Sequence, residues 1–382
     1  MTNNSSLFEN ETQNGSLTPT KHLLVPIIYV GCLCVLGIPG NTLVLAVYGL
    51  MRKSSVYRTI ILVLGVNDLL VCGITLPFEL YTMNNYLSFR EKWTCKIFRF
   101  LNYLFVHNSI LVLLLMAIER YRRVCRPLKV QMSTKIGRIW ILFIFLFCLV
   151  YTVPNIFIRG IHTVQIHANL TGHECATSDD FINSNIPIIY TSISFFICLG
   201  SIAILIIVYF CIGKNIFEHF KFVKSLKTEG KSDHQSTVEC TANSKSISIS
   251  DNCDLESVGR ISMHSRFSSS FKQNWPSMRY SQRPKKVPAH HSNKSTKIAL
   301  LITIIFVLSY IPHLVASTMS GVHGDSFISR YLPLSVFHLM QRTYAMNHVV
   351  NPFIYGFIDR RFRIECKTVL ILLFQKFKCR LK

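Results

Sequence analysis

The sequence predicts an all-α membrane protein, a bundle of seven transmembrane helices. Half of the 382 residues are hydrophobic and 16% are charged, and the mean hydropathy of +0.35 is high for a water-soluble domain. The charged residues are also separated from long apolar runs. Each run is close to or longer than the roughly 18 to 20 residues with which a helix crosses about 30 Å of hydrocarbon. In lipid, a single apolar segment satisfies its backbone polar groups only as a helix.

Five apolar runs contain no Asp, Glu, Lys or Arg: residues 24–51, 101–118, 139–158, 182–213 and 298–324. Two further spans are interrupted by ionisable residues, 59–80 by Asp68 and Glu79 and 331–358 by Arg342. Such residues normally face the bundle interior, so both spans are still predicted to cross. The expected organisation is a tail over 1–23, helices one to five over 24–213, a long loop over 214–297, helices six and seven over 298–358, and a C-terminal segment over 359–382.

The positions of Lys and Arg predict the orientation. Short cytoplasmic loops are enriched in these residues, and here they gather after span one, in 52–58, and after span three, in 120–138. We therefore expect a multi-pass protein of the plasma membrane with an extracellular N-terminus and a cytoplasmic C-terminus. Acceptor sequons for N-glycosylation lie on the predicted outer side, at Asn3, Asn4, Asn10, Asn14 and Asn169.

The net charge of +22 resembles that of nucleic-acid-binding proteins, but that inference needs a basic face on a soluble domain. Because the basic residues follow the membrane topology, no nucleic-acid partner is expected. The long loop over 214–297 begins as a continuation of helix five. From about Thr228 it is rich in Ser, Lys and Asn, and we expect most of it to be disordered.

Most of the 13 cysteines lie within the spans or on the cytoplasmic side, where thiols stay reduced. Cys95 and Cys175 are the two that lie clearly outside, and we expect one disulfide between them. This bond would hold the loop after span four across the mouth of the bundle. The alternative is two free thiols in an oxidising medium.

Several motifs in fixed order carry a close resemblance to the rhodopsin-like G-protein-coupled receptors, over about residues 24–378 apart from the long loop. The matching residues are Gly40-Asn41, Leu64-Gly65-Val66-Asn67-Asp68-Leu69, Cys95, Glu119-Arg120-Tyr121, Trp140, Phe306, Pro312, Asn351-Pro352-Phe353-Ile354-Tyr355 and Phe362. The resemblance implies a receptor that binds an extracellular ligand and activates heterotrimeric G proteins through outward movement of helix six. It also implies a short amphipathic eighth helix, arrestin and receptor kinases as partners, and contact with membrane lipid.

Asp68 is a charge buried at mid-membrane, and the resemblance places Ser109, Asn347 and Asn351 around it. Four oxygen-bearing side chains around one cavity suit a small hard cation, so an allosteric sodium ion is one hypothesis. The alternative is a hydrogen-bonded polar network without an ion. No other cofactor and no enzymatic activity are expected.

The resemblance further implies an activation switch made of Glu119, Arg120, Tyr121, Tyr209, Phe306, Tyr310, Pro312, Asn351, Pro352 and Tyr355. Arg120 pairs with Glu119 in the resting state in this interpretation, and a purely topogenic arginine is the alternative. The family's second, acidic partner on helix six is missing, because 257–324 contains neither Asp nor Glu. We expect higher basal activity from this. Tyr310 also replaces the usual tryptophan, either as an aromatic toggle or as a static hydrogen-bonding group, and Ser201 replaces a proline of helix five.

The expected ligand is a peptide. Aminergic receptors carry an aspartate where this chain has Asn102, and opsins carry a lysine where it has Ala345. A mixed-charge set lines the predicted mouth and suits a peptide: Glu79, Arg99, Asn102, Tyr103, His313, Gln341 and Arg342. Each of these residues alone is equally compatible with an interhelical or headgroup contact. The motifs are most similar to those of the cholecystokinin and orexin groups of neuropeptide receptors. A lipid or small-molecule ligand, or a seven-helix transporter, channel or membrane enzyme, are the alternatives.

Overall fold

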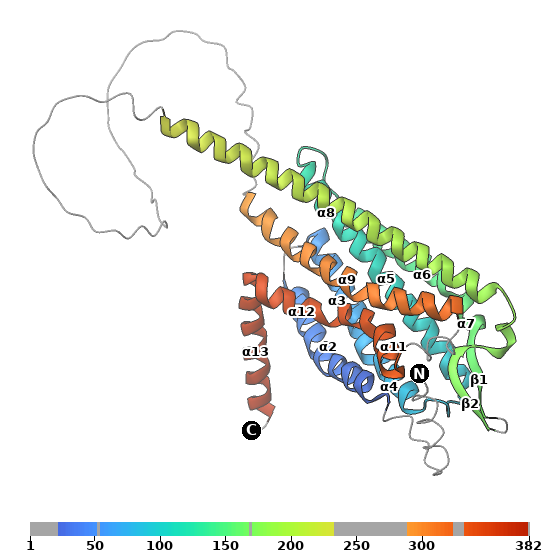
Figure 1. Ribbon diagram of the computed structural model, residues 1–382. Helices are drawn as coiled ribbons and strands as arrows, with labels where there is room; N and C mark the ends of the chain where they lie inside the picture. The colour runs from blue at the N-terminus through green and yellow to red at the C-terminus, as the bar shows by residue number, and fades with distance from the viewer. Residues whose placement is uncertain (1–21, 52–53, 168–169, 233–288, 324–331, 381–382) are drawn as a thin grey trace, which may run out of the picture. The chain divides into compact units, whose positions relative to one another are not determined.

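The computed structural model describes residues 22–51, 54–167, 170–232, 289–323 and 332–380 (Figure 1). The five predicted glycosylation asparagines lie outside the described residues. Residues 1–218 and 289–382 form one compact unit. A second unit covers residues 219–288, and its described part is the end of one long helix.

The first unit is a helical bundle with one β-hairpin. In chain order the elements are α2 (Leu24–Leu50), α3 (Val56–Leu70), the π-helical turn η2 (Val71–Thr75), α4 (Leu76–Asn84), α5 (Lys92–Cys125), α6 (Thr134–Thr152), α7 (Pro154–Ile158), β1 (Arg159–His167), β2 (Leu170–Thr177), the 3₁₀ turn η3 (Asp179–Phe181), α8 (Ile186–Ser232), α9 (Ala289–His323), α11 (Leu334–Arg342), the 3₁₀ turn η4 (Thr343–Met346), α12 (Asn347–Ile358) and α13 (Arg360–Arg380).

Six of the predicted spans are helices that are long and apolar enough, by length and composition, to cross a membrane: 24–50, 56–84, 92–125, 134–158, 186–218 and 296–320. The seventh span is also helical, but η4 divides it into α11 and α12. Polar residues such as His338, Gln341 and Asn347 lower its hydropathy. The sequence and the helices together give the predicted all-α bundle of seven spans.

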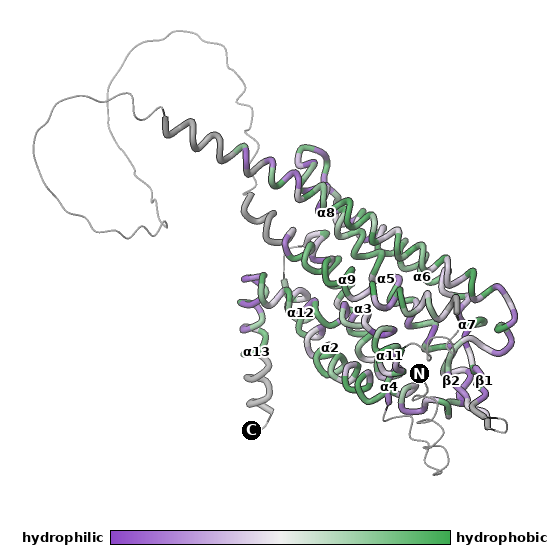
Figure 2. The backbone as a smooth tube through the Cα atoms, viewed as in Figure 1, coloured by the Kyte–Doolittle hydropathy of each residue, from purple (hydrophilic) through white to green (hydrophobic). Residues whose placement is uncertain are grey.

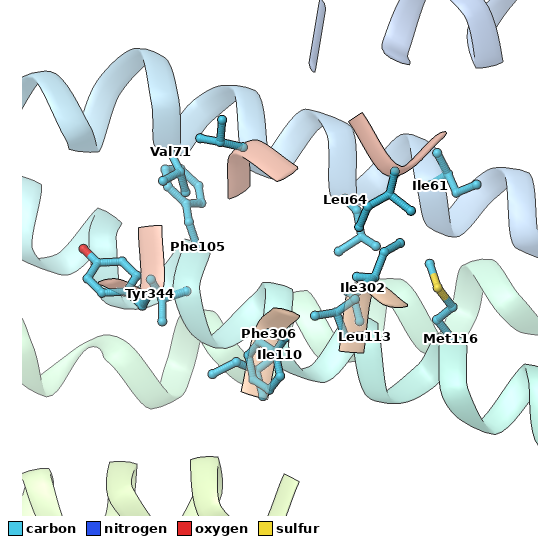
Figure 3. Close-up of a cluster of buried hydrophobic side chains, with 14 of the residues drawn as sticks. Ile61, Leu64, Val71, Phe105, Ile110, Leu113, Met116, Ile302, Phe306 and Tyr344 are labelled. Carbon is cyan, nitrogen blue, oxygen red and sulfur yellow. The ribbon is translucent and has the colours of Figure 1, made fainter. Parts of the chain in front are cut away.

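Apolar side chains both fill the bundle and cover its outside. Figure 3 shows side chains from α3, α5, α9 and η4 converging in the buried core, among them Leu64, Leu113 and Phe306. The outer faces are apolar too, and only 28% of the most apolar window of the α6 span is buried inside the protein. Figure 2 shows hydrophobic residues along α6 and α8 and hydrophilic ones on the hairpin. An exposed apolar surface of this extent requires lipid around it.

Small residues allow α2 to approach its neighbours closely. A Cβ added at Gly40 would lie 3.0 Å from Cγ of Pro352 in α12, and one added at Gly37 would overlap Sγ of Cys72 in η2. The Asn41 side chain donates to the main-chain oxygens of Gly37 (3.0 Å) and His348 (2.8 Å). The Gly40-Asn41 motif therefore joins helix one to helix seven.

The helix ends differ from the ends of the charge-free runs. Helix α8 continues to Ser232, although its apolar run ends at residue 213, and α9 begins at Ala289 rather than at 298. The apolar length reflects the thickness of hydrocarbon to be crossed, whereas a helix can continue into water. At the other end of the chain, Asp359 accepts hydrogen bonds from the main-chain N–H groups of Arg361 (2.9 Å) and Phe362 (3.4 Å) and so caps α13.

The hairpin pairs β1 with β2 in antiparallel register, from Arg159 opposite Thr177 to His167 opposite Leu170. Cys175 in β2 forms a disulfide with Cys95 in the first turn of α5, which confirms the predicted bond. We call the end of the bundle beside this hairpin the hairpin end. The opposite end, where α5 finishes, is called the Arg120 end.

Candidate functional site

At the hairpin end, the Glu79 carboxylate of α4 is paired with two guanidinium groups from two other helices. Its Oε1 lies 2.5 Å from Nη1 of Arg99 in α5, and its Oε2 lies 2.8 Å from Nη2 of Arg342 in α11. The Glu79 and Arg342 side chains are 4% and 7% exposed. We call these three residues the outer triad. They carry one negative and two positive charges and join helices two, three and seven.

The other predicted mouth residues lie close by but make separate contacts. Asn102 and Tyr344 exchange hydrogen bonds of 2.9 and 3.1 Å. The Tyr103 hydroxyl accepts from Nη2 of Arg159 at 2.6 Å. For His313, Nδ1 lies 2.6 Å from the main-chain oxygen of Gln341, so the Gln341 side chain takes no part in that contact.

Three residues of this region were missed in the sequence prediction. They are Tyr344, which bonds Asn102, His338, whose Nδ1 lies 3.0 Å from Nη1 of Arg342, and Arg159, which stacks on Tyr103 with 5.4 Å between its Cζ and the ring centroid. The signal for Arg159 was its charge at the end of an apolar run. No comparable signal marked Tyr344 or His338, because aromatic residues are common in membrane helices.

The hairpin is attached to this end of the bundle by covalent and polar contacts. Besides the disulfide, Nη2 of Arg99 donates to the Cys175 main-chain oxygen at 3.3 Å. Where β2 leads into η3, Asp179 accepts from the main-chain N–H (3.0 Å) and hydroxyl (2.7 Å) of Thr163 and lies 3.0 Å from Nδ1 of His162. Partial burial raises the pKa of the Asp179 carboxyl, but these hydrogen bonds outweigh it and lower the pKa to about 2.

In the middle of the bundle, the buried Asp68 carboxylate contacts two side chains of α12. Nδ1 of His348 lies 2.7 Å from Oδ1, and Nδ2 of Asn351 donates to Oδ2 at 2.8 Å. The two residues are three positions apart and so share one helix face. The structure thus brings Asn351 to Asp68 as expected and adds His348, which sequence reasoning missed.

The remaining two predicted neighbours of Asp68 have other surroundings. The Ser109 hydroxyl accepts from Nδ2 of Asn67 at 2.6 Å, and that same amide donates to the main-chain oxygen of Phe105 at 2.8 Å. Asn347 is buried at the start of α12. Within the described ranges, the hydrogen bonds to the Asp68 side chain come from His348 and Asn351.

At the Arg120 end, the Glu119 carboxylate is also paired with two arginines, but all three residues belong to α5. Nε of Arg120 lies 3.0 Å from Oε2, and Nη2 of Arg123 lies 2.6 Å from Oε1. We call this set the inner triad. The Arg120 guanidinium also packs on the Tyr57 ring of α3, with Cζ 4.0 Å from the centroid. Tyr121, the third residue of the motif, is partly buried and packs against the core.

The predicted switch residues of helices five, six and seven are largely buried, with Tyr209 in α8 and Tyr355 in α12. The Tyr310 ring in α9 lies 4.4 Å from that of Phe306 and 6.2 Å from that of Tyr344. Its hydroxyl is buried and has no hydrogen-bond partner among the described residues. This favours the aromatic role over a static hydrogen bond.

Three helices of the predicted switch have a proline, or a residue in place of one, within them. Pro312 lies inside α9 and Pro352 inside α12. At Ser201, where the family has a proline, α8 is regular α-helix and the hydroxyl donates to the Ile197 main-chain oxygen at 2.7 Å. The bulge that the proline would create is therefore absent at this position.

Comparison with known proteins decides the family. A family model described as "7 transmembrane receptor (rhodopsin family)" matches residues 40–355. The chain belongs to this family. This receptor is 24% identical over 358 residues to the cholecystokinin receptor of Xenopus laevis, which covers 90% of this chain and 76% of the relative. It is 37% identical over 110 residues to a purinoceptor of Gallus gallus, which covers 28% of this chain and 33% of that protein.

The fold agrees with this assignment. The crystal structure of squid rhodopsin matches this receptor with a TM-score of 0.65 at 16% sequence identity, covering 94% of this chain and 87% of the rhodopsin chain. The resemblance predicted from the motifs is confirmed: the chain is a class A G-protein-coupled receptor that is similar to cholecystokinin receptors. Members of the family are receptors and not enzymes, and this chain is a multi-pass membrane receptor.

Proposed function

We propose that this receptor binds an extracellular peptide that carries an anionic group, and that it then activates heterotrimeric G proteins. The supporting observation is the excess of guanidinium groups at the hairpin end. Arg99 and Arg342 share the single Glu79 carboxylate, and Arg159 lies nearby on Tyr103. Buried Nε of Arg342 has no hydrogen-bond partner among the described residues. An anionic ligand group complements this surplus, since charge-assisted bonds from arginine to carboxylates are strong and directional.

The outer triad gives such a ligand a way to act. A ligand carboxylate that pairs with Arg99 competes with Glu79, and it weakens a tie between α4 and α5. A ligand shifts a conformational equilibrium only through contacts that differ between the states. In this proposal the released state is the one in which the inner half of α9 has moved outward and a G protein binds.

Helix six has the features needed for that movement. Pro312 removes a backbone hydrogen bond within α9 and provides a flexible point. In the two turns before it, Phe306 and Tyr310 pack against each other, and the Tyr310 ring faces Tyr344, the residue that Asn102 contacts. A ligand that moves Tyr344 therefore acts on the Tyr310 ring.

Orientation and further partners complete the proposal. The N-terminus and the hairpin lie outside the plasma membrane, and the Arg120 end faces the cytosol, as the distribution of Lys and Arg predicts. Arrestin and receptor kinases act on the cytoplasmic side. The polar network around Asp68 connects helices two and seven within the same switch, and Asn351, Pro352 and Tyr355 follow it on α12.

An anionic small molecule is the second candidate ligand. The match to a purinoceptor over 110 residues favours it. Independently, the arginines that would bind a carboxylate also complement phosphate groups. The two candidate ligands differ in size, because a peptide is long enough to contact the hairpin around His162 and Asp179 as well.

The test is a ligand screen on cells that express the full chain, read out by intracellular calcium and cyclic nucleotides. A peptide library and a panel of nucleotides and acidic lipids are applied to the wild type and to the Arg342→Gln and Arg123→Gln variants. We expect an acidic peptide to activate the wild type, with a loss of potency of tenfold or more in Arg342→Gln and little change in Arg123→Gln. Activation by basic or neutral ligands alone, at equal potency on all three proteins, contradicts the proposal.

A further inference from the structure

We propose that His348 takes the place of a sodium ion at Asp68, so that this receptor binds no sodium there. The residues around the carboxylate do not fit the ion. One oxygen faces Nδ1 of His348 at 2.7 Å and the other accepts from Nδ2 of Asn351 at 2.8 Å. Each Asp68 oxygen therefore already faces a nitrogen group of α12, whereas a hard cation requires a shell of oxygen ligands.

The imidazole lies where a cation would have to bind. The His348 side chain is fully buried and the Asp68 side chain is 1% exposed, so an ion that reached the carboxylate would have to displace the ring. Because the carboxylate only accepts hydrogen bonds, Nδ1 of His348 carries the proton in this contact. The ring thus supplies the positive end of a dipole to the buried charge, as an ion would supply its charge.

The backbone holds His348 in this position. Its main-chain oxygen accepts from Nδ2 of Asn41 at 2.8 Å, and α2 approaches α12 closely at Gly40. The other ring nitrogen, Nε2, is buried and has no hydrogen-bond partner among the described residues. An unsatisfied buried polar atom costs free energy. The contact of Nδ1 with Asp68 offsets this cost and so accounts for the orientation of the ring.

Two oxygen groups beside Asp68 accept hydrogen bonds from other side chains. The Ser109 hydroxyl accepts from the Asn67 amide at 2.6 Å, and the Asn67 side-chain oxygen accepts from Nδ2 of Asn108 at 3.2 Å. These bonds join α3 and α5 beside Asp68 and do not include its carboxylate. The contacts of Asp68 with His348 and Asn351 link helices two and seven, and the Asn67–Ser109 bond beside them links helices two and three.

The test measures the thermal stability of the purified full-length receptor in NaCl and in choline chloride at equal ionic strength. The wild type is expected to show the same Tm in both salts. In His348→Ser, which removes the ring and offers a hydroxyl oxygen, we expect NaCl to raise Tm in a saturable way by about 2 to 4 °C. The increase should be lost in the His348→Ser/Asp68→Asn double variant. His348→Ala serves as a second variant should His348→Ser not fold.

Two results would overturn the proposal. One is a saturable sodium-dependent increase in Tm of the wild type that Asp68→Asn abolishes, because sodium would then bind despite His348. The other is the absence of any sodium response in both His348→Ser and His348→Ala, because His348 would then not be the group that excludes the ion. Neither measurement uses a ligand or a G protein, so the outcome is independent of the proposed function.

Discussion

Glu79 and Glu119 are both buried glutamates paired with two arginines, but they lie at opposite ends of the bundle and have different consequences. The outer triad takes its members from α4, α5 and α11. The inner triad takes all three from α5. An ion pair within one helix is already present when that helix is inserted but not yet packed, so it adds little to helix association. A pair between helices forms only in the assembled bundle.

This difference shows which end of the receptor is held together by charge. The hairpin end is joined across three helices and by the Cys95–Cys175 disulfide. At the Arg120 end, the two ion pairs of Glu119 lie within α5, and no acidic residue occurs in 257–324 to tie Arg120 to helix six. In our proposal the ligand acts on the hairpin end, and the G protein binds at the Arg120 end.

The largest expected effect comes from removing each glutamate charge. Glu79→Gln leaves the buried Arg342 and the partly buried Arg99 without their carboxylate, and we expect it to lower the free energy of unfolding by about 3 to 5 kcal/mol. Glu119→Gln is the matched control. We expect a smaller loss of about 1 to 3 kcal/mol, because Arg123 is 41% exposed and the buried Arg120 guanidinium keeps its contact with Tyr57 although it loses its carboxylate.

Thermal and denaturant unfolding of the two variants in detergent measures this contrast. Equal losses, or a larger loss in Glu119→Gln, would mean that helix association does not depend on the outer triad.

The disulfide should have the next largest effect. Replacing Cys95 and Cys175 together by Ser frees the hairpin from α5, and we expect a loss of about 2 to 4 kcal/mol. Reducing agent should reproduce the decrease in Tm in the wild type and have no effect on the double variant. If reductant leaves the Tm of the wild type unchanged under conditions that expose the disulfide, the outer triad alone holds the hairpin end together.

Arg342 and Arg123 offer a finer comparison within the two triads. Arg342→Gln removes a buried partner of Glu79 and should cost more than Arg123→Gln, for which we expect about 0 to 1 kcal/mol because the guanidinium is largely in solvent. High salt should reduce the small effect of Arg123→Gln further. Differential scanning fluorimetry at low and high salt separates the two variants, and a reversed order would contradict the burial argument.

The smallest expected effect concerns the base of the hairpin. Because the pKa of Asp179 is lowered to about 2, its carboxylate is fully ionised at neutral pH and its hydrogen bonds to Thr163 persist there. Their contribution is present above the unfolded pKa and is lost as the pH falls through about 2. Asp179→Asn should speed hydrogen exchange of the Thr163 amide at neutral pH several-fold. An unchanged rate would show that the strands alone protect it.

The sequence predicted the spans, the disulfide and the family, because apolar length and motif order are local properties. It predicted the contact of Asn351 with Asp68 and the pair of Arg120 with Glu119, but not the other partners within the sites. Glu79 and Arg342 were both placed at the mouth, yet nothing in the order of residues shows that they pair with each other. His348 was missed because one histidine in an apolar run is more often an ordinary core residue. The 3₁₀ break at Thr343–Met346 was missed as well, since the break carries no Gly or Pro.

The most direct test of the account is guanine-nucleotide exchange without ligand, on a panel of purified heterotrimeric G proteins with the receptor in lipid nanodiscs. Arg120→Ala is the inactive reference. Because helix six offers no acidic partner at the Arg120 end, we predict that the wild type speeds exchange on at least one G protein several-fold over Arg120→Ala. Exchange rates identical for the two proteins on every heterotrimer would contradict the expected basal activity.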